Sequence, residues 1–441
     1  MIISRPVSGK IRSNRTLVQI LLLGIFFVSP WIVMPSGTPF IRLDIPARRF
    51  HFLGNFYIPQ EGIILFLFLL TMGLSLFFFT ALIGRVWCGW ACPQTVYTDV
   101  FDFFGRMVLG KKYGKADAPK AGIVAVHFVW ILVSLIASFH WIAYFAGPYK
   151  MVGDLLTFNI IGESYPYFLG FFTVAMYLDM GYVREQFCKY GCPYARFQTI
   201  LMDEHSYNIT YDYKRGEPRR NKKEKIGDCV SCNMCLVVCP TGIDIREGMQ
   251  IGCIACGKCA DACTIIMAKE NKKTLIDYFS LNQVATQDKK IQWIRPRTLL
   301  YGTLLTIVVS TAVFKLVTRI PLSVKTLADP TIEPSYIDKD TLRQMYKIKL
   351  YNISYSTQNL QFKAFTEDGN RELVVRTGIE GNIYKVESGE VLDERIMLEL
   401  NIKEDEKALK SVPVVIHVVD TGNPSIHVEK KIPLSIPLAK N

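Results

Sequence analysis

Long apolar segments alternate with charged loops over the first two thirds of the chain. A helix needs about 20 apolar residues to cross a bilayer, and five segments meet this length: Thr16–Met34, Gly62–Gly84, Gly122–Phe145, Tyr165–Val183 and Thr298–Thr318. No small-residue cleavage site follows the first apolar run, so we expect an uncleaved anchor and not a signal peptide. The pattern predicts a multidomain membrane protein with a five-helix transmembrane region.

The apolar pattern changes near residue 335 from long runs to short, β-rich segments. Turn signals such as Gly381-Asn382 and Ser388-Gly389 separate them. The expected strands are Tyr346–Tyr355, Leu360–Thr366, Leu373–Arg376, Ile383–Glu387, Arg395–Lys403, Val412–Val419 and His427–Ile436. About seven strands in roughly 100 residues is typical of an immunoglobulin-like sandwich. We therefore expect a C-terminal all-β immunoglobulin-like sandwich with a structural or partner-binding role.

Basic residues are unevenly distributed between the loops. The 441 residues carry a net charge of +12, and Lys and Arg gather in residues 1–15, 85–121 and 184–297, beside apolar segments. Because cytoplasmic loops of membrane proteins are rich in Lys and Arg, we expect the N-terminus, the 85–121 loop and residues 184–297 in the cytoplasm. Residues 319–441 are expected outside, in the periplasm of a Gram-negative cell. This explanation of the charge favours contact with the bilayer and argues against nucleic-acid binding.

The 12 cysteines all lie between Cys88 and Cys263, in four short clusters. Every cluster falls in a segment that the charge pattern assigns to the cytoplasm, where thiols stay reduced. A disulfide scaffold would spread cysteines through the exported regions. The clustering therefore indicates metal ligation.

Two of the clusters form a bacterial ferredoxin pattern. Cys229-Val-Ser-Cys232-Asn-Met-Cys235-Leu-Val-Val-Cys239-Pro240 is a full C-x2-C-x2-C-x3-C-P run, and a second run of the same spacing, without the proline, holds Cys253, Cys256, Cys259 and Cys263. In such pairs the fourth cysteine of each run binds the other cluster. We assign Cys229, Cys232, Cys235 and Cys263 to a first 4Fe-4S cluster, and Cys253, Cys256, Cys259 and Cys239 to a second. The chemistry implied is one-electron transfer.

The other two clusters are C-x3-C-P motifs at predicted cytoplasmic span ends: Cys88-Gly-Trp-Ala-Cys92-Pro93 and Cys188-Lys-Tyr-Gly-Cys192-Pro193. Spacing i, i+4 predicts two thiols on one helical face, with a bend at the proline just beyond them. If the helices are neighbours, Cys88, Cys92, Cys188 and Cys192 share one site, and soft thiolates favour Cu(I). Iron binding, zinc binding, a reversible disulfide and simple packing of the cysteines remain alternatives to copper binding.

Four further residues of spans three and four carry possible metal-ligating groups: His127, His140, Met176 and Met180. A single His or Met in an apolar helix more often packs or bonds to a neighbouring helix.

The chain divides into a four-helix region at 1–210, a ferredoxin domain at 211–297, a fifth span at 298–318 and the β domain at 319–441.

Several stretches resemble the FixG/CcoG/RdxA family of membrane polyferredoxins. They are Cys88 to Val96, the string Cys192-Pro-Tyr-Ala-Arg-Phe-Gln198, the segment Tyr211 to Arg219 and the segment Cys239 to Arg246. The resemblance covers nearly the whole chain and implies a role in assembling cbb(3)-type cytochrome c oxidase, with Cu(II) reduced to Cu(I). By motif match, the four C-x3-C-P cysteines would handle copper and the eight ferredoxin cysteines would supply electrons.

The expected partners are an unidentified cytoplasmic electron donor, a copper chaperone or P-type ATPase, oxidase assembly factors, the lipid bilayer and, in a homodimer, a second copy of the chain. Two other functions compete with copper reduction. One is a quinol dehydrogenase that feeds a periplasmic reductase, and the other is a non-enzymatic scaffold for oxidase assembly.

Overall fold

The computed structural model describes residues 3–35, 37–220, 227–288, 290–404 and 406–437. They form two compact units, which are described separately. The first unit comprises residues 1–32, 41–43 and 63–313, and the second comprises residues 33–40, 44–62 and 314–441. Every cysteine therefore belongs to the first unit.

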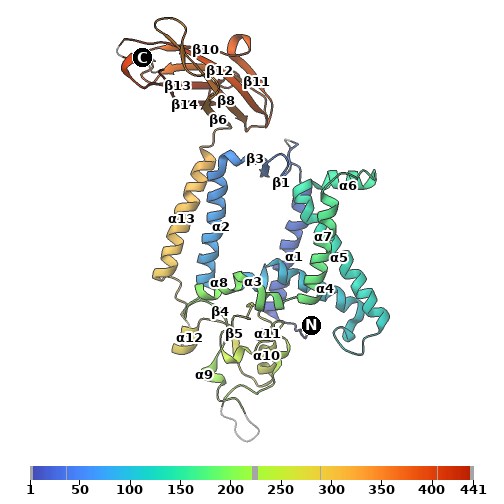
Figure 1. The fold of residues 1–441 in the computed structure, drawn as a ribbon. Helices are drawn as coiled ribbons and strands as arrows, with labels where there is room; N and C mark the ends of the chain where they lie inside the picture. The colour runs from blue at the N-terminus through green and yellow to red at the C-terminus, as the bar shows by residue number, and fades with distance from the viewer. Residues whose placement is uncertain (1–2, 36, 221–226, 289, 405, 438–441) are drawn as a thin grey trace. The chain divides into compact units, whose positions relative to one another are not determined.

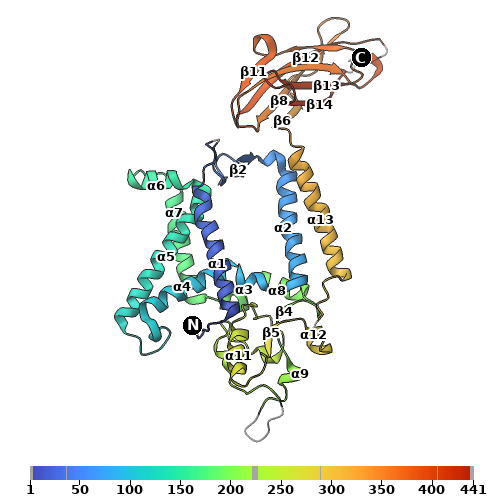
Figure 2. The ribbon, with the colours of Figure 1, turned by 180° about the vertical axis from the view of Figure 1, so that it is seen from behind.

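The first unit is mainly helical (Figures 1 and 2). Its helices are α1 Lys10–Val28, α2 Gly62–Ile83, α3 Val86–Trp90, α4 Pro93–Leu109, α5 Lys120–Ala146, α6 Pro148–Leu156, α7 Tyr165–Leu178, α8 Pro193–Leu201, α9 Tyr213–Gly216, α10 Met234–Val237, α11 Lys258–Lys269, α12 Leu281–Thr286 and α13 Pro296–Val317. Two π-helical turns, Asp179–Val183 and Phe187–Gly191, separate α7 from α8. Strands β4 (Asn208–Tyr211) and β5 (Ile276–Phe279) pair antiparallel and bracket the ferredoxin segment.

Four helices in the described part of the chain are long and apolar enough to cross a membrane: Lys10–Trp31, Gly62–Ile83, Lys120–Ala146 and Pro296–Val317. The predicted span at Tyr165–Val183 is a 14-residue α-helix, α7, that continues as a π-helical turn. A helix of this length spans about 21 Å, short of the hydrocarbon core of about 30 Å. The predicted count of five spans is therefore not confirmed, although α7 packs along α5.

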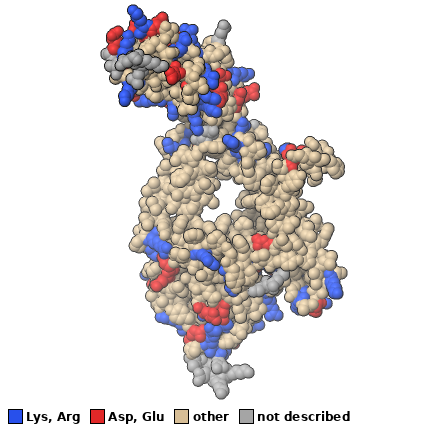
Figure 3. All heavy atoms as spheres, in the orientation of Figure 1, with Lys and Arg blue, Asp and Glu red and all other residues tan. Residues whose placement is uncertain are grey.

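The surface of these helices agrees with a membrane environment. Figure 3 shows few Lys, Arg, Asp or Glu side chains over α2 and α13 on the face drawn. Leu69 and Phe314 are examples of large apolar side chains that are 60 % and 62 % exposed. Apolar surface on this scale is unfavourable in water and favourable in lipid. The chain is accordingly a multi-pass membrane protein.

The second unit holds a small β2–β3 hairpin and a larger sheet. The strands are β2 Arg49–Phe52, β3 Asn55–Tyr57, β6 Leu322–Ala328, β7 Ser335–Tyr336, β8 Thr341–Asn352, β9 Gln358–Thr366, β10 Glu372–Arg376, β11 Ile383–Val386, β12 Val391–Asn401, β13 Ser411–Asp420 and β14 His427–Ser435. Strand β1, Ile41–Asp44, precedes the hairpin. The strand predicted at Tyr346–Tyr355 is β8, which starts earlier, at Thr341. The sequence pattern did not predict β6.

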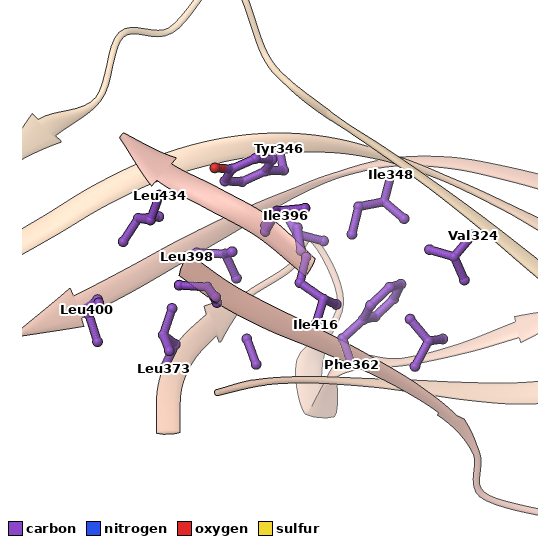
Figure 4. Close-up of a cluster of buried hydrophobic side chains, with 14 of the residues drawn as sticks. Val324, Tyr346, Ile348, Phe362, Leu373, Ile396, Leu398, Leu400, Ile416 and Leu434 are labelled. Carbon is purple, nitrogen blue, oxygen red and sulfur yellow. The ribbon is translucent and has the colours of Figure 1, made fainter. Parts of the chain in front are cut away.

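The immunoglobulin-like sandwich is not confirmed. Seven strands follow one path, β14-β13-β9-β10-β12-β8-β6, while β11 pairs with β9 and β7 pairs with β8. The two end strands of the path lie against each other, so the sheet is nearly barrel-shaped. Strict alternation of buried and partly buried residues in β8 directs one face inward. Tyr346, Ile348, Ile396 and Ile416 meet inside this sheet (Figure 4). Alternation specifies which face is buried but not how the strands close, which depends on pairing between distant segments.

Candidate functional site

Two cysteine-lined cavities lie between α10, α11 and the loops before them. The cysteines that line the first are Cys229, Cys232, Cys235 and Cys263. The cysteines that line the second are Cys235, Cys239, Cys253, Cys256 and Cys259. Helix α11 contributes Cys259 to one cavity and Cys263, one turn later, to the other. This arrangement has the crossed form that the spacing predicts, and the ligand assignment stays a prediction.

The two runs have the same local backbone. Ser231 and Ala255 have φ of 54° and 52°, and Asn233 and Gly257 have φ of 57° and 75°. Because these pairs occupy equivalent positions in the two runs, the sequence repeat is also a repeat of conformation. Left-handed residues between ligands turn the chain so that successive cysteines face one centre.

The donor set fits 4Fe-4S clusters. Burial raises the pKa of Cys235 to about 11 and that of Cys253 to about 12, so these thiols would be protonated at neutral pH without a positive partner. Iron–sulfur clusters are held by Cys thiolates and supply that positive charge. When bound, they provide one-electron transfer.

The C-x3-C-P motifs differ from the predicted geometry. Cys88 lies in the short helix α3, whereas Cys92 is extended, with φ of −61° and ψ of 129°, and precedes α4. Cys188 lies in a π-helical turn, and Cys192 is likewise extended before α8. The prediction of two thiols on one helical face is therefore wrong. Proline disfavours helix in the residue before it and is well suited to the first helical position, so Pro93 and Pro193 begin new helices.

The structure nevertheless brings the two motifs together. Cys88 and Cys188 belong to one buried apolar cluster with Ile254 and Cys256. Burial, followed by the neighbouring charges of Cys92, Cys88 and Cys192, raises the pKa of Cys188 to about 12. Burial also raises the pKa of Cys88 to about 11. We call Cys88, Cys92, Cys188 and Cys192 the four-thiol site, which adjoins Cys256 of the second ferredoxin cavity.

Two glutamines, which the sequence alone did not single out, tie the motifs to each other. The Cys88 thiol donates to Oε1 of Gln198, at 2.8 Å, and Gln198 follows the second motif. Nε2 of Gln94, which follows the first motif, donates to Oδ1 of Asp179 at 3.1 Å and to the carbonyl oxygen of Arg184 at 2.9 Å. The sequence does contain a feature that could have identified both glutamines. A glutamine follows the Cys-Pro of each C-x3-C-P motif, within the stretches that resemble the FixG/CcoG/RdxA family.

A buried charge network connects α1 to the second cavity. Arg15, which is 1 % exposed, donates from Nη1 to the carbonyl oxygen of Cys256 at 3.3 Å and pairs with Asp99. Lys258 Nζ lies 3.5 Å from Asp99 Oδ1. Burial lowers the pKa of Lys258 to about 8. The sequence pattern indicates only the orientation role of the basic N-terminal segment that contains Arg15. The contact with Cys256 cannot be recognised from it, because it joins residues 241 positions apart.

The four additional candidates lie outside these cysteine groups. His127 Nδ1 is 3.1 Å from the hydroxyl of Tyr177, and His140 Nδ1 is 2.8 Å from the carbonyl oxygen of Ile136. Met180 Sδ accepts a bond from Thr98, at 3.6 Å, and Met176 packs in the same apolar cluster. In the described residues, the four-thiol site included, no three His, Cys, Asp or Glu side chains converge closely enough to hold a single metal ion. Copper at the four-thiol site would therefore be held by two thiolates or would draw the thiols together.

Comparisons with known proteins identify the family. A model described as "4Fe-4S dicluster domain" matches residues 183–281, and one described as "4Fe-4S binding domain" matches residues 64–112. The nitrogen fixation protein FixG of Rhizobium meliloti is 32 % identical over 80 % of this chain and 76 % of its own length. Protein RdxA of Cereibacter sphaeroides is 33 % identical over 86 % of this chain and 84 % of its own. The chain belongs to the FixG/RdxA family.

One further relative and one solved structure are also similar to this chain. Protein RdxB of Cereibacter sphaeroides is 32 % identical over 89 % of this chain and 87 % of its own length. A crystal structure of a FixG-related protein from Vibrio parahaemolyticus matches 27 % of this chain and 98 % of its own, at 15 % identity and a TM-score of 0.21. As a FixG/RdxA protein, the chain is a membrane iron–sulfur electron-transfer protein.

Proposed function

We propose that this protein reduces Cu(II) to Cu(I) at the four-thiol site, for assembly of a cbb(3)-type cytochrome c oxidase. The observation that carries the proposal is that Cys88 and Cys188 lie in one buried cluster with Ile254 and Cys256, which puts the candidate copper ligands near a predicted ferredoxin ligand. The iron–sulfur family membership supports the electron-transfer part of the proposal.

The reaction moves one electron. A reduced one-electron carrier protein in the cytoplasm is the reductant, and each Cu(II) accepts one electron to become Cu(I). No bond between heavier atoms has to form or break, so the protein supplies ligands and position. Soft thiolates stabilise Cu(I) over Cu(II). Because burial raises the pKa of Cys88 and Cys188, copper displaces protons from these thiols when it binds.

The proposal includes transfer of the Cu(I) product to other proteins. The Cu(I) product passes to a copper chaperone or P-type ATPase and then to oxidase assembly factors. The N-terminus and the ferredoxin segment face the cytoplasm of a cell with an inner membrane, and the C-terminal sheet faces the periplasm. A homodimer is part of the same proposal.

The test is a single-turnover experiment on the full-length protein. Anaerobic, dithionite-reduced protein freed of excess reductant is mixed with Cu(II), while cluster oxidation is followed by absorbance and Cu(I) is captured by a chromogenic chelator. The wild type is compared with a variant that carries Ser at positions 88, 92, 188 and 192. We expect Cu(I) and cluster oxidation in equal electron equivalents for the wild type, and loss of both in the variant.

Iron content and cluster EPR provide the control, because the variant must keep its ferredoxin clusters. Equal oxidation in both proteins would remove copper from the four-thiol site. Absence of Cu(I) from the wild type would contradict copper reduction and favour the quinol dehydrogenase or scaffold function.

A second occupant of the four-thiol site is favoured by one observation. The match described as "4Fe-4S binding domain" covers residues 64–112, which contain only two cysteines, Cys88 and Cys92. Four thiolates hold a cubane, and Cys188 and Cys192 would complete the set. Iron analysis separates the alternatives: about eight iron atoms per chain indicate two clusters, and about 12 that fall to about eight in the Ser variant indicate a third.

A further inference from the structure

The glycine in the first C-x3-C-P motif lies in a close backbone contact. A Cβ atom on Gly89 would be 2.5 Å from the carbonyl oxygen of Ile254 and 2.8 Å from the carbonyl carbon and oxygen of Ala255. Real Cβ atoms do not approach backbone that closely. Position 89 therefore has to be glycine for the turn that carries Cys88 to approach the loop that joins Cys253 to Cys256 this closely.

Side chains hold the same two segments together on either side of Gly89. Trp90 Nε1 donates to the hydroxyl of Tyr278 at 2.7 Å, and this hydroxyl donates to the carbonyl oxygen of Ala255 at 2.7 Å. Arg85, which is 1 % exposed, donates to the carbonyl oxygen of Ile251. The loop of the second ferredoxin run is thus fixed against the first C-x3-C-P turn through backbone atoms.

The first ferredoxin site has different surroundings. Cys232 is exposed. Arg246, whose side chain is 6 % exposed, pairs with Asp244 at 2.6 Å and lines the cavity of Cys229, Cys232, Cys235 and Cys263. The cluster of apolar residues around Cys88 and Cys188 includes Cys256 and no cysteine of this first cavity. The two ferredoxin sites are therefore not equivalent with respect to the four-thiol site.

We propose that Gly89 is a positioning residue that sets the separation between the Cys253–Cys256 loop and the four-thiol site, and that this loop's cluster, not the first one, is electronically coupled to that site. The inference rests on the proposed function, because it assigns the acceptor to the four thiols. It adds which ferredoxin site adjoins the acceptor and which residue determines the distance.

The test uses Gly89→Ala in the full-length protein. Its matched control is Gly73→Ala in α2, where an added Cβ has no neighbour within 4 Å. Both proteins are loaded with Co(II), a paramagnetic thiol-binding ion that reduced clusters do not reduce, and thiolate-to-cobalt absorption reports binding. Power saturation of the cluster EPR signals then reports proximity to cobalt. A Cys232→Ser protein identifies which signal belongs to the first cluster.

We expect cobalt to speed relaxation of the second cluster's signal in the wild type and in Gly73→Ala, with less effect on the first. In Gly89→Ala, iron content and both signals remain, the enhancement falls, and Cu(II) reduction slows roughly tenfold at unchanged KM. A merely structural role would lower iron content or raise KM without changing relaxation.

Three outcomes would overturn the inference. One is stronger relaxation of the first cluster's signal, and the second is a Gly89→Ala protein that relaxes like Gly73→Ala. The third is absence of cobalt binding, because the inference requires an acceptor site at these thiols. If cobalt relaxes the second cluster but Cu(II) is not reduced, the inference holds and copper reduction alone fails.

Discussion

Single residues determine the electrostatic surroundings of the cysteines. Arg15 comes from the N-terminal half of α1, yet its guanidinium contacts the carbonyl oxygen of Cys256. Asp99 pairs with Arg12, Arg15 and Lys258, so three cations surround one carboxylate. The excess positive charge beside a cluster ligand favours the reduced, more negative form of the cluster. Charge and hydrogen bonding are among the factors that set cluster potentials.

Replacing Arg15 by Gln removes one buried cation beside Cys256. We expect the reduction potential of the second cluster to fall by on the order of 50 mV, because a unit charge at such distances is worth a few kcal/mol at intermediate dielectric and Asp99 offsets part of it. Potentiometric titration with EPR detection measures the shift. Arg106→Gln, which removes a cation paired with Asp102 at 3.3 Å, is the control and leaves the potential unchanged. Equal shifts of the reduction potential in both variants would contradict a specific effect of the Arg15 charge on the second cluster.

Glu406 gives the sheet a pH-dependent contact. Its Oε2 accepts from Nη1 of Arg371 at 3.0 Å, and this hydrogen bond lowers the pKa of Glu406. A lowered folded-state pKa stabilises the fold above the unfolded value of about 4.3, and the effect is lost as pH falls through the folded-state pKa.

Glu406→Gln should therefore destabilise the second unit by about 1 kcal/mol at pH 7 and by nothing measurable below the folded-state pKa. Hydrogen exchange of β10 and β12 amides at several pH values measures this. Glu404→Gln, at a side chain that is 93 % exposed, is the control. A pH-independent difference between Glu406→Gln and wild type would exclude the ion pair as the cause.

At the scale of elements, proline and π-helical turns shape the membrane-edge motifs. The local sequence indicates a change of backbone direction at Pro93 and Pro193, and we expected each proline to bend a continuous helix. Instead, these prolines are the first residues of α4 and α8. The chain therefore turns between the two cysteines of each pair. The π-helical turns at Asp179–Val183 and Phe187–Gly191 have no simple sequence signature, and such turns often occur at functional sites.

Helix α1 is capped by a residue from the ferredoxin segment. The carboxylate of Asp261 accepts from the backbone N–H of Ile11 at 3.2 Å and of Arg12 at 2.8 Å. We expect Asp261→Ala to destabilise the first turn of α1 by about 1–2 kcal/mol, which raises amide exchange in residues 11–13 roughly tenfold. Asp261→Asn keeps an acceptor and should show a smaller increase. Unchanged exchange in the Ala variant would show that the cap is not formed.

For the whole molecule, membrane orientation depends on whether α7 crosses the bilayer. Four spans put both chain ends on one side, and five put them on opposite sides. The distribution of Lys and Arg predicts a cytoplasmic N-terminus and a periplasmic C-terminus, which requires α7 and its π-helical extension to cross.

Reporter fusions test this topology. Green fluorescent protein, which fluoresces after cytoplasmic folding, and alkaline phosphatase, which is active after export, are each fused to either end. We expect fluorescence only from the N-terminal fusion and phosphatase activity only from the C-terminal fusion. Fluorescence from both ends would mean an even number of spans and would reverse the predicted location of the sheet.

The sequence by itself determined four of the five predicted spans, the two ferredoxin runs and the paired C-x3-C-P motifs, because hydrophobic length and ligand spacing are local properties of the chain. Tertiary structure alone decided what lies beside them: Gly89 against Ile254, Gln198 at the Cys88 thiol and Arg15 at Cys256. It also decided that the sheet path nearly closes on itself. These features join segments tens to hundreds of residues apart, and their formation depends on packing that no local pattern encodes.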